Sequence, residues 1–441
     1  MSVRRYKPYP AYKDSGVEWL RQIPAHWGIK PLKYLTAFAT GWTPPTGRED
    51  LYGGEHLWAN ISDLGPRVLM TTEKTISDAA ISEARLKKVK AGSLLFSFKL
   101  SVGLTSIAGA DMFTNEAIAA FAPSPHIDTR YLYWAAPVLV PRNAQENIYG
   151  APLLSRDRIA NARLVCPPLS EQRAIAALLD RKTAQIDALA AQKERLIERL
   201  QEEQTALITR TVTKGLDPTV AIKDSSIEWL GKIPAHWEVK RLWHLTPPRR
   251  GIMYGIVLPG PNVDDGVPIV KGGDVSADRL RLDRLNRTTR EIEAGYVRSR
   301  LQGGDLVYAI RGSIGEVAIV PDELADANLT QDAARIAYTS KTHGRWLLYA
   351  MKSAAVFAQL EAGALGATIR GINIRDLKRA SIAVPPLAEQ RAIAEFLNRE
   401  TGRFDALVSK VHDGINRLEE HRAALISAAV TGKIDVREDA A

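Results

Sequence analysis

The chain has few of the features that mark secreted, membrane or metal-binding proteins. Among its 441 residues there is a single cysteine, Cys166, which excludes an intrachain disulfide framework and a zinc site built on several cysteines. No run of about 18 apolar residues occurs, so no segment is predicted to span a bilayer. The first residues lack the apolar core that a signal peptide needs. We therefore expect a cytoplasmic protein with no membrane partner.

Motifs that carry catalysis are also missing. There is no GxxxxGK[ST] phosphate loop, no GxGxxG after a strand and no HExxH pair. There is also no Asn-Pro-Pro-aromatic or Asp-Pro-Pro-aromatic tetrad of the kind used by amino-methyltransferases. His26 and His236 each stand between an alanine and a tryptophan in two similar segments, which favours a packing role over metal ligation. The sequence thus predicts no catalytic residue, no metal site and no cofactor in this chain.

The composition is that of a folded protein with a mild basic excess. Hydrophobic residues make up 45% and charged residues 25% of the chain, which is typical of domains with buried cores. The length predicts more than one domain. The net charge of +9, from 59 basic and 50 acidic side chains, permits nucleic acid as a partner without establishing it.

An internal duplication organises the whole chain. Residues 14–35 repeat as 224–245, with 13 of 22 positions identical, and residues 167–217 repeat as 385–435 without a gap. Such a repeat predicts two copies of one structural unit.

The regions between the repeated blocks have diverged. Residues 36–160 and 246–378 share only scattered landmarks, such as Thr114-Asn115-Glu116 opposite Thr330-Gln331-Asp332. Drift after duplication would explain this divergence. The alternative is that the two copies recognise different targets.

The second repeated block predicts a long helix in each copy. Paired prolines precede it, Ser170 is suited to be the N-cap, and Glu171 suits the first turn. About 40 helical residues would make a rod of roughly 60 Å. Apolar residues recur three and four positions apart, so we expect the two helices to pair as an antiparallel coiled coil that holds the globular segments apart. The predicted seam consists of Leu179, Ile186, Leu189, Leu196, Leu200 and Leu207, and of Leu397, Phe404, Leu407, Val411, Leu418 and Leu425.

The segments between the helices are predicted to be mixed α/β (α+β). Strand-like runs occupy Val89–Phe98 and Gln302–Ile310, and helical patterns occupy Thr129–Val140 and Gly344–Glu361. The predicted domains are residues 1–165 and 218–383 as globular domains, 166–217 and 384–435 as helices, and 436–441 as a tail.

Basic loops follow the predicted strands at matching places. Lys99–Gly103 and Arg311–Gly315 each contain a cation, a hydroxyl and a glycine, which suits contact with a nucleic-acid backbone or base edge. Residues 279–300 carry seven arginines against three acids. A solvated surface explains such a run more often than DNA contact does.

The repeated blocks resemble those of a known family, the specificity subunits of Type I restriction-modification systems. The likeness is strongest in Glu-Trp-Leu-x-x-Ile-Pro-x-His-Trp at 18–27 and 228–237, and in Pro-Pro-Leu-x-Glu-Gln-Arg-x-Ile-Ala at 167–176 and 385–394. It extends over nearly the entire chain.

The divergent regions are similar to the family's target-recognition domains. Gly41-Trp42-Thr43-Pro44 resembles the opening of such a domain. The second opening, Arg249-Arg250-Gly251-Ile252, departs from that pattern, so no contacts are transferred to it.

The resemblance implies a non-catalytic DNA-binding subunit. Two target-recognition domains would each recognise one half of a bipartite, asymmetric double-stranded DNA site, with the helices as a ruler. The helices would also dock two methyltransferase subunits, which carry S-adenosylmethionine, and restriction/translocase subunits, which use ATP and Mg. The expected DNA-binding residues are Lys99, Ser101, Thr114 and Asn115 for one half-site and Arg311, Ser313, Gln331 and Arg370 for the other, and the expected docking residues are Gln172, Arg173, Arg195, Gln390 and Arg391.

Two other interpretations remain at this point. The chain could be a stand-alone duplicated nucleic-acid-binding scaffold without restriction partners. It could also be an enzyme whose active site carries no familiar motif. Co-purification with a methyltransferase subunit would separate the first from a specificity subunit, and turnover by the isolated chain would indicate the second.

Overall fold

The structure, a computed structural model, divides into two compact units. It describes residues 6–143, 145–146, 152–276, 278–364 and 371–437. The first unit comprises Met1–Lys193 with Asp413–Ala441, and the second comprises Glu194–His412. Each of the two long helices therefore contributes one part to each unit. No helix among the described residues is long and apolar enough to cross a membrane.

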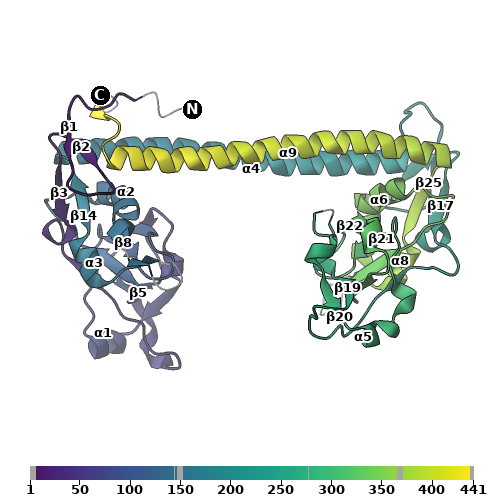
Figure 1. Cartoon of the computed structure of the whole chain (residues 1–441), viewed down its shortest axis with the longest axis horizontal. Helices are drawn as coiled ribbons and strands as arrows, with labels where there is room; N and C mark the ends of the chain where they lie inside the picture. The colour runs from purple at the N-terminus through teal and green to yellow at the C-terminus, as the bar shows by residue number, and fades with distance from the viewer. Residues whose placement is uncertain (1–5, 144, 147–151, 277, 365–370, 438–441) are drawn as a thin grey trace. The chain divides into compact units, whose positions relative to one another are not determined.

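The globular part of the first unit is built on two small sheets. A five-stranded sheet has the order β4-β11-β8-β9-β6, and a three-stranded sheet has the order β10-β5-β7. Helix α2 packs on β8 and β9 and buries one face of the larger sheet (Figure 1). The elements are β1 Tyr12–Asp14, β2 Gln22–Pro24, β3 Gly28–Pro31, β4 Phe38–Thr40, β5 Tyr52–Ala59, β6 Val68–Leu69, β7 Lys74–Ile76, α1 Asp78–Ala84, β8 Leu94–Ser97, β9 Thr105–Ala108, β10 Phe113–Thr114, β11 Ile118–Phe121, α2 Thr129–Leu139, β12 Gln145–Glu146, β13 Pro152–Leu153, α3 Arg156–Asn161 and β14 Arg163–Cys166.

The second unit repeats this plan with a smaller main sheet. Its four-stranded sheet has the order β18-β24-β21-β22, and a three-stranded sheet has the order β20-β19-β23. The helix predicted over 344–361 is interrupted at Ser353, so it forms two helices, α6 and α7. The elements are β15 Ile222–Asp224, β16 Lys232–Pro234, β17 Glu238–Arg241, β18 Met253–Tyr254, β19 Val267–Val270, β20 Asn286–Thr288, α5 Arg290–Ala294, β21 Leu306–Ala309, β22 Val317–Ile319, β23 Asn328–Leu329, β24 Ala333–Ile336, α6 Gly344–Lys352, α7 Ala354–Ala364, α8 Ile374–Arg379 and β25 Ser381–Val384.

A two-stranded stem joins each globular part to its long helix. In the first unit β3 pairs antiparallel with β14, and in the second β17 pairs antiparallel with β25 in the same register. At the end of each stem the same backbone hydrogen bond occurs, from Leu32 to Ala162 (2.9 Å) and from Leu242 to Ala380 (2.8 Å). Cys166 ends the first stem, and burial raises the pKa of its thiol to about 11, which disfavours the reactive thiolate at neutral pH.

The two long helices are α4, Leu169–Lys214, and α9, Leu387–Val430. The backbone N–H of Gln172 already donates to the carbonyl of Pro168 at 2.9 Å, so the helix begins before Ser170. The prediction of Ser170 as the N-cap is therefore wrong. The paired prolines set the start instead, because a fixed φ and a missing N–H are tolerated in the first turn.

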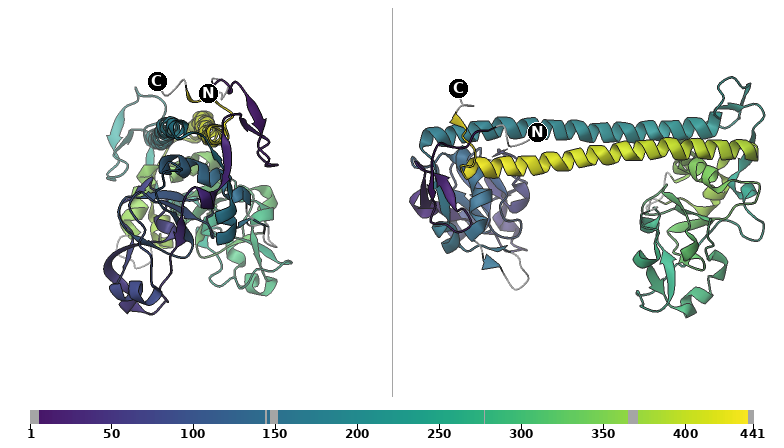
Figure 2. Two further views of the ribbon diagram at one scale, coloured as in Figure 1. Left: turned by 90° about the vertical axis from the view of Figure 1, so that its left-hand side faces the viewer. Right: turned by 45° about the horizontal axis from the view of Figure 1, so that its top comes forward.

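In each unit α4 and α9 pack side by side and run antiparallel, as the fold class predicted (Figures 1 and 2). In the first unit the start of α4 and the end of α9 belong to one hydrophobic core, and Arg422 Nε lies 3.0 Å from Asp187 Oδ1. In the second unit the end of α4 and the start of α9 share a core, and Gln204 Nε2 donates to Asp405 Oδ1 at 3.0 Å.

The seam between the helices differs from the predicted one in three leucines. Leu189, Leu196 and Leu407 are 43%, 44% and 48% exposed, whereas the other predicted seam residues are buried or half-buried. The neighbouring residues Ala190, Ile197 and Val408 take their places in the seam, and Lys193 packs along Gly414, where an added Cβ would come within 3.2 Å of the lysine Nζ. The observed seam keeps a strict three-and-four spacing and consists of Leu179, Thr183, Ile186, Ala190, Lys193, Ile197, Leu200, Gln204, Leu207 and Thr211 on α4, and of Leu397, Thr401, Phe404, Val408, Val411, Ile415, Leu418, Arg422, Leu425 and Ala429 on α9.

The glycine that follows each long helix packs against a tryptophan of a repeated block. Gly432 adopts φ +75° and would bring a Cβ within 2.8 Å of Trp27. Gly215 adopts φ +76° and faces Trp237 in the same way. Glycine suits both positions because the left-handed conformation and the lack of space each disfavour a side chain.

The N-terminal segment closes on the segment that follows α9. Asp435 N–H donates to the Lys7 carbonyl at 2.8 Å, and the Tyr12 hydroxyl donates to the Gly432 carbonyl at 3.1 Å. The first hairpin, formed by β1 and β2, therefore meets the end of α9, as the second hairpin, formed by β15 and β16, meets the end of α4 (Figure 2).

Candidate nucleic-acid interface

Loops from distant parts of the sequence meet at one edge of the first globular part. Trp42 N–H donates to the Thr114 carbonyl at 3.0 Å, and Phe98 N–H donates to the Ala117 carbonyl at 3.0 Å. We call this set the first loop cluster; it comprises residues 41–44, 60–63, 98–103 and 114–116.

The second unit carries an equivalent second loop cluster. Ile256 N–H donates to the Leu329 carbonyl at 2.7 Å. Ile310 N–H donates to the Asp332 carbonyl at 2.9 Å, and the Ile310 carbonyl accepts from Ile372 N–H at 2.8 Å. The cluster comprises residues 255–260, 271–274, 311–315, 330–332 and 371–373.

Strand register corrects how the two clusters correspond. Thr114 pairs with Ala59 and Leu329 pairs with Val270, each in a parallel two-residue ladder. Asn115 therefore corresponds to Thr330, one position away from the predicted match of Thr114-Asn115-Glu116 with Thr330-Gln331-Asp332. Gln331 accordingly occupies the place of Glu116.

The second opening also lies elsewhere than predicted. Gly255 and Ile256 make the backbone hydrogen bonds that Gly41 and Trp42 make in the first unit. Arg250 instead forms a two-pronged ion pair with the buried Asp305, at 2.7 and 2.5 Å. This pair anchors Arg250 to the interior of the second unit, with a quarter of its side chain exposed.

The two basic loops have the same backbone, as their sequences predicted. Leu100 and Gly312 are both left-handed, with φ of +57° and +72°, and Gly103 and Gly315 follow with +99° and +93°. Each loop presents its cation, Lys99 or Arg311, to solvent. Sequence reasoning thus placed both cations correctly at the loop clusters, and their contact with DNA stays a prediction.

A hollow in the second loop cluster brings two predicted residues together. It has a volume of about 290 Å³, and Arg311 and Gln331 both line it. Its remaining walls come from Tyr254, Ile310, Ile372, Asn373 and Ile374. Guanidinium and amide groups around one hollow can donate to and accept from a base edge.

The other predicted DNA-binding residues differ in accessibility. Thr114 is only 2% exposed and packs against Gly41, so we exclude it as a DNA contact. Asn115 is half-buried, and its Oδ1 accepts from Ala117 N–H at 3.1 Å. Ser101 is exposed and Ser313 half-buried, while Arg370 lies outside the described residues.

Two of the predicted docking residues lie beneath the surface. Gln172 and Gln390 are each 1% exposed. Their side chains accept from the backbone N–H of Asp128 and His343 at 2.8 Å and donate to proline carbonyls at 2.9 Å. These amides fasten each globular part to its helix and are not available to a partner. Arg173, Arg195 and Arg391 are exposed, and their docking role stays a prediction.

Sequence reasoning missed a carboxylate that ties the two repeated blocks together in the first unit. Glu171 lies 2.7 Å from His26 Nε2 and accepts hydrogen bonds from Trp27 Nε1 at 2.9 Å and the Tyr9 hydroxyl at 3.1 Å. Burial and the adjacent carboxylate raise the pKa of Tyr9 far above its usual value. The side chain of Glu171 is 10% exposed.

The second unit repeats this arrangement in a more open form. Glu389 lies 2.7 Å from His236 Nε2 and accepts from Trp237 Nε1 at 2.9 Å. Its side chain is 42% exposed. The joint repetition of glutamate, histidine and tryptophan in both copies was the signal that could have revealed this contact, and both histidines are structural as predicted.

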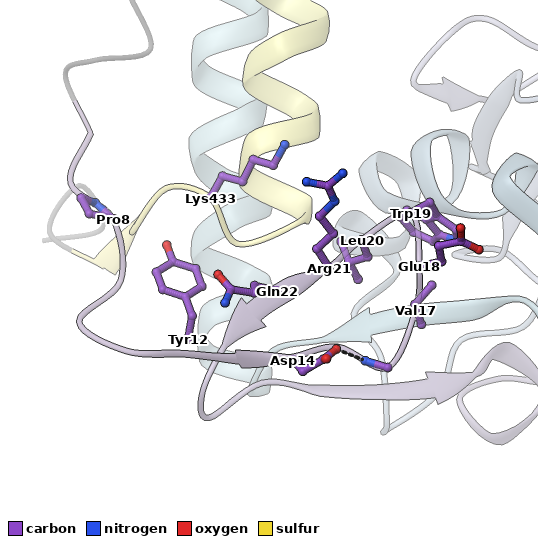
Figure 3. Close-up of a pocket in the computed structure, with 11 residues that line it drawn as sticks. Pro8, Tyr12, Asp14, Val17, Glu18, Trp19, Leu20, Arg21, Gln22 and Lys433 are labelled. Atoms are coloured by element: carbon purple, nitrogen blue, oxygen red, sulfur yellow. Dashed lines mark hydrogen bonds between the residues drawn. The ribbon is translucent and has the colours of Figure 1, made fainter.

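The first hairpin borders an open pocket of about 1130 Å³ (Figure 3). Trp19 and Arg21 come from the repeated block, and Lys433 comes from the segment after α9. Asp14 Oδ1 accepts from Gly16 N–H at 2.8 Å and shapes the loop that forms one wall. Most of the lining residues come from the N-terminal segment that contains the repeated block, and none belongs to the first loop cluster.

The arginine-rich segment of the second unit is partly structural. Arg300 forms a two-pronged pair with Glu293 at 2.7 Å, and Asn328 donates to the same carboxylate at 3.0 Å. The Arg300 guanidinium lowers the pKa of Glu293, which is 2% exposed. Arg287 donates to the Gly266 carbonyl. The other five are exposed: Arg279, Arg281, Arg284, Arg290 and Arg298.

Comparison with known proteins agrees with the duplicated plan. The sequence profile of the Type I restriction modification DNA specificity domain matches residues 24–199 and 262–417. The chain belongs to this family. It is 26% identical over 311 residues to the Type I restriction enzyme EcoBI specificity subunit of Escherichia coli, a match that covers 69% of this chain and 65% of that relative.

Solved structures share the fold. One, from a study of complex assembly and conformational transition of the type I R-M system, has a TM-score of 0.66 and 16% identity over 93% of this chain and 99% of that one. The HsdS subunit from Thermoanaerobacter tengcongensis has a TM-score of 0.51 and 15% identity over 93% of this chain and 98% of that one. At this level of identity the likeness concerns the fold alone.

Proposed function

We propose that this chain is the specificity subunit of a Type I restriction-modification complex. In this role it recognises a bipartite double-stranded DNA site and binds the methyltransferase and restriction subunits. One observation carries the proposal: two loop clusters share the backbone hydrogen bonds that join their loops, yet present different side chains. That arrangement suits two recognition surfaces with different targets on one duplicated frame.

Each loop cluster supplies a cation for its own half-site. Arg311 can form two hydrogen bonds to guanine in the major groove, and Gln331 in the same hollow can accept or donate at a neighbouring base. Lys99 occupies the place of Arg311 but offers a single point charge, which suits a phosphate or a single acceptor. The remaining candidates for polar contacts with DNA are Ser101, Asn115 and Ser313. DNA contact by Arg370 also stays a prediction.

The outer faces of the long helices supply docking surfaces. Leu189 on α4 and Leu407 on α9 occupy the same position of the repeat, and both are nearly half exposed. Exposed leucines on helices that also carry exposed arginines, such as Arg195 on α4, suit an interface with another protein. Two equivalent positions suit two methyltransferase subunits. S-adenosylmethionine, ATP and Mg are then held by the partner subunits, and this chain catalyses no step.

Co-expression tests this function directly. The chain is produced with the methyltransferase subunit from the same genome, the complex is purified, and methylated adenine in host DNA is mapped by single-molecule sequencing. We expect co-purification and one motif of two parts with a fixed gap. Purification without any partner, and no methylated motif, would instead favour the stand-alone scaffold. Chemical turnover by the isolated chain would favour an enzyme.

A further inference from the structure

Two leucines stand out by their exposure. Among the described residues, Leu100 and Leu258 are the most exposed of the large hydrophobic side chains, at 91% and 80%, and Tyr34 follows at 66%. Leu100 belongs to the first loop cluster and Leu258 to the second. Each cluster therefore presents one almost fully exposed apolar side chain, and Leu100 directly follows its cation, Lys99.

The backbone at Leu100 makes its presence costly for folding. Its φ of +57° lies in the left-handed region, where Cβ crowds the following carbonyl. The equivalent residue of the second unit is Gly312, which adopts the same conformation without that cost. Leu100 is strained and also buries little surface, so neither folding nor packing accounts for a leucine at this place.

The backbone on both sides of Leu258 is held in place. Ile256 N–H donates to the Leu329 carbonyl at 2.7 Å, and the Pro259 carbonyl accepts from the Thr288 hydroxyl at 2.7 Å. The leucine stands between these two anchors. A fixed backbone with a solvated apolar side chain is preorganised for an external apolar contact.

DNA offers one apolar group at the edges of its bases. In the major groove the polar groups of the bases are hydrogen-bond donors and acceptors, whereas thymine presents its 5-methyl group, where cytosine has only a C–H. We propose that Leu100 and Leu258 each contact the methyl group of a thymine, one in each half of the recognised site. The inference rests on the proposed function, because it requires that the two loop clusters bind DNA.

Leucines are also inserted between base steps by some DNA-binding proteins. Such wedges enter the minor groove and kink the duplex. The polar and cationic neighbours in both clusters, Lys99 and Ser101 in one and Arg311 and Gln331 in the other, suit a base edge in the major groove better. We therefore assign the methyl contact, and insertion becomes an outcome of the test.

A cycle of protein and DNA changes tests the assignment. Binding of the assembled methyltransferase complex is measured on duplexes that carry its mapped site, with each thymine replaced in turn by deoxyuridine, which lacks only the methyl group. For the wild-type chain we expect one position in each half-site where this replacement weakens binding about fourfold, the effect of losing one buried methyl group. Leu100→Gly should abolish the effect in one half-site and leave the other unchanged, and Leu258→Ala should do the reverse.

Each variant is the control for the other, and Asp326→Gly controls for relief of backbone strain. Asp326 is also left-handed, with φ +66°, but it lies outside both loop clusters. Effects of deoxyuridine that persist in Leu100→Gly and Leu258→Ala would overturn the methyl contact. A loss of binding that is the same for thymine and deoxyuridine, together with a loss of DNA bending, would replace it with insertion. If the wild-type complex shows no sequence preference at all, the proposed function fails, and this outcome is distinct from the other two.

Discussion

The two units share a frame but differ in what the frame presents. Backbone hydrogen bonds hold both loop clusters in the same form, and the stems pair in the same register. The side chains at equivalent positions of the two units differ: Lys99 corresponds to Arg311, Leu100 to Gly312, and Glu116 to Gln331. A frame held by backbone groups constrains few side chains in the loops, so recognition can change without loss of the fold.

The units also differ in how polar groups are buried. The second unit encloses a charged network in which Glu293 pairs with Arg300 and Asp305 pairs with Arg250. In the first unit a carboxylate of the long helix instead binds the globular part: Asp180 on α4 accepts a hydrogen bond from Trp134 Nε1 at 2.8 Å and forms an ion pair with Arg130. The equivalent residue in the second unit is the neutral Asn398, which accepts from the Tyr349 hydroxyl at 2.9 Å. The predictions below act on these differences.

The largest effect is expected from breaking the network of the second unit. Glu293→Ala leaves the Arg300 guanidinium and the Asn328 amide without their shared partner. Because Arg300 is 41% exposed and water can solvate its charge, the cost comes mainly from the lost buried acceptor, about 2–3 kcal/mol. Urea unfolding of the variant should show an earlier transition for the second unit. Asp283→Ala removes an exposed pair with Arg281 and should change stability little. Equal effects of the two substitutions would contradict the structural role of Glu293.

The same carboxylate predicts a response to acid. Its pKa is lowered in the folded state, so it stabilises the protein above its unfolded pKa of about 4.3 and loses this contribution as pH falls through the lower folded value. Unfolding followed between pH 5 and pH 2 should show the free energy of unfolding falling less steeply in Glu293→Gln than in the wild type. If the free energy of unfolding of the two proteins fell with pH along parallel curves, protonation of Glu293 would not contribute to acid unfolding.

Glu171 and Glu389, the carboxylates that bind the repeated histidine and tryptophan, should contribute differently to stability. Glu171 is nearly buried and serves three partners, whereas Glu389 is partly exposed and serves two. Glu171→Gln should cost about 2 kcal/mol, since it weakens several buried hydrogen bonds to a charged group. Glu389→Gln should cost less than half of that. Thermal unfolding of the two variants side by side measures the difference, and an equal loss would show that burial does not separate the units here.

Loss of the loop cations should act on one half-site at a time. Arg311→Ala is expected to weaken binding to the cognate site about 10- to 100-fold and to relax the second half of the motif, because a bidentate base contact carries that discrimination. Lys99→Ala should weaken binding less and act on the first half. Titration of both variants against duplexes mutated in either half, at one fixed salt concentration, checks this. Unchanged affinity for Arg311→Ala while the complex still assembles would remove Arg311 from the interface.

The smallest effect on folding is expected at the outer leucines. Leu189→Asp and Leu407→Asp alter exposed positions of α4 and α9, so stability should change by no more than about 0.5 kcal/mol. Co-purification of the methyltransferase subunit should fall in both. Ile197→Ala, a buried seam residue, should show the opposite pattern, with lower stability and retained docking. Full docking by both leucine variants would place the partner elsewhere.

Much of the frame was predictable because it is repeated. Duplication revealed the units, proline pairs and apolar spacing revealed the helices, and glycine punctuation revealed the matched loops at Lys99 and Arg311. The seam was predicted less well, since Thr183, Ala190 and Lys193 occupy positions that a search for leucines passes over.

The candidate site was less predictable for a physical reason. Landmarks such as Thr330-Gln331 resemble Thr114-Asn115, but the strand ladder that sets their register depends on pairing with distant residues. Thr114 was predicted to contact DNA, and Gln172 and Gln390 to dock a partner, but all three are buried. A polar residue type alone does not show whether its side chain will be buried and hydrogen-bonded to the backbone.

The central claim is that the units are interchangeable recognition domains on one frame, and an exchange tests it most directly. The stem hydrogen bonds from Leu32 to Ala162 and from Leu242 to Ala380 mark matched junctions, so residues 32–162 can replace residues 242–380. The motif methylated by a complex containing this chain is then mapped by single-molecule sequencing. The account predicts a bipartite motif in which both halves carry the base pattern of the first half-site. A folded, assembled complex that still methylates the original second half-site would contradict it.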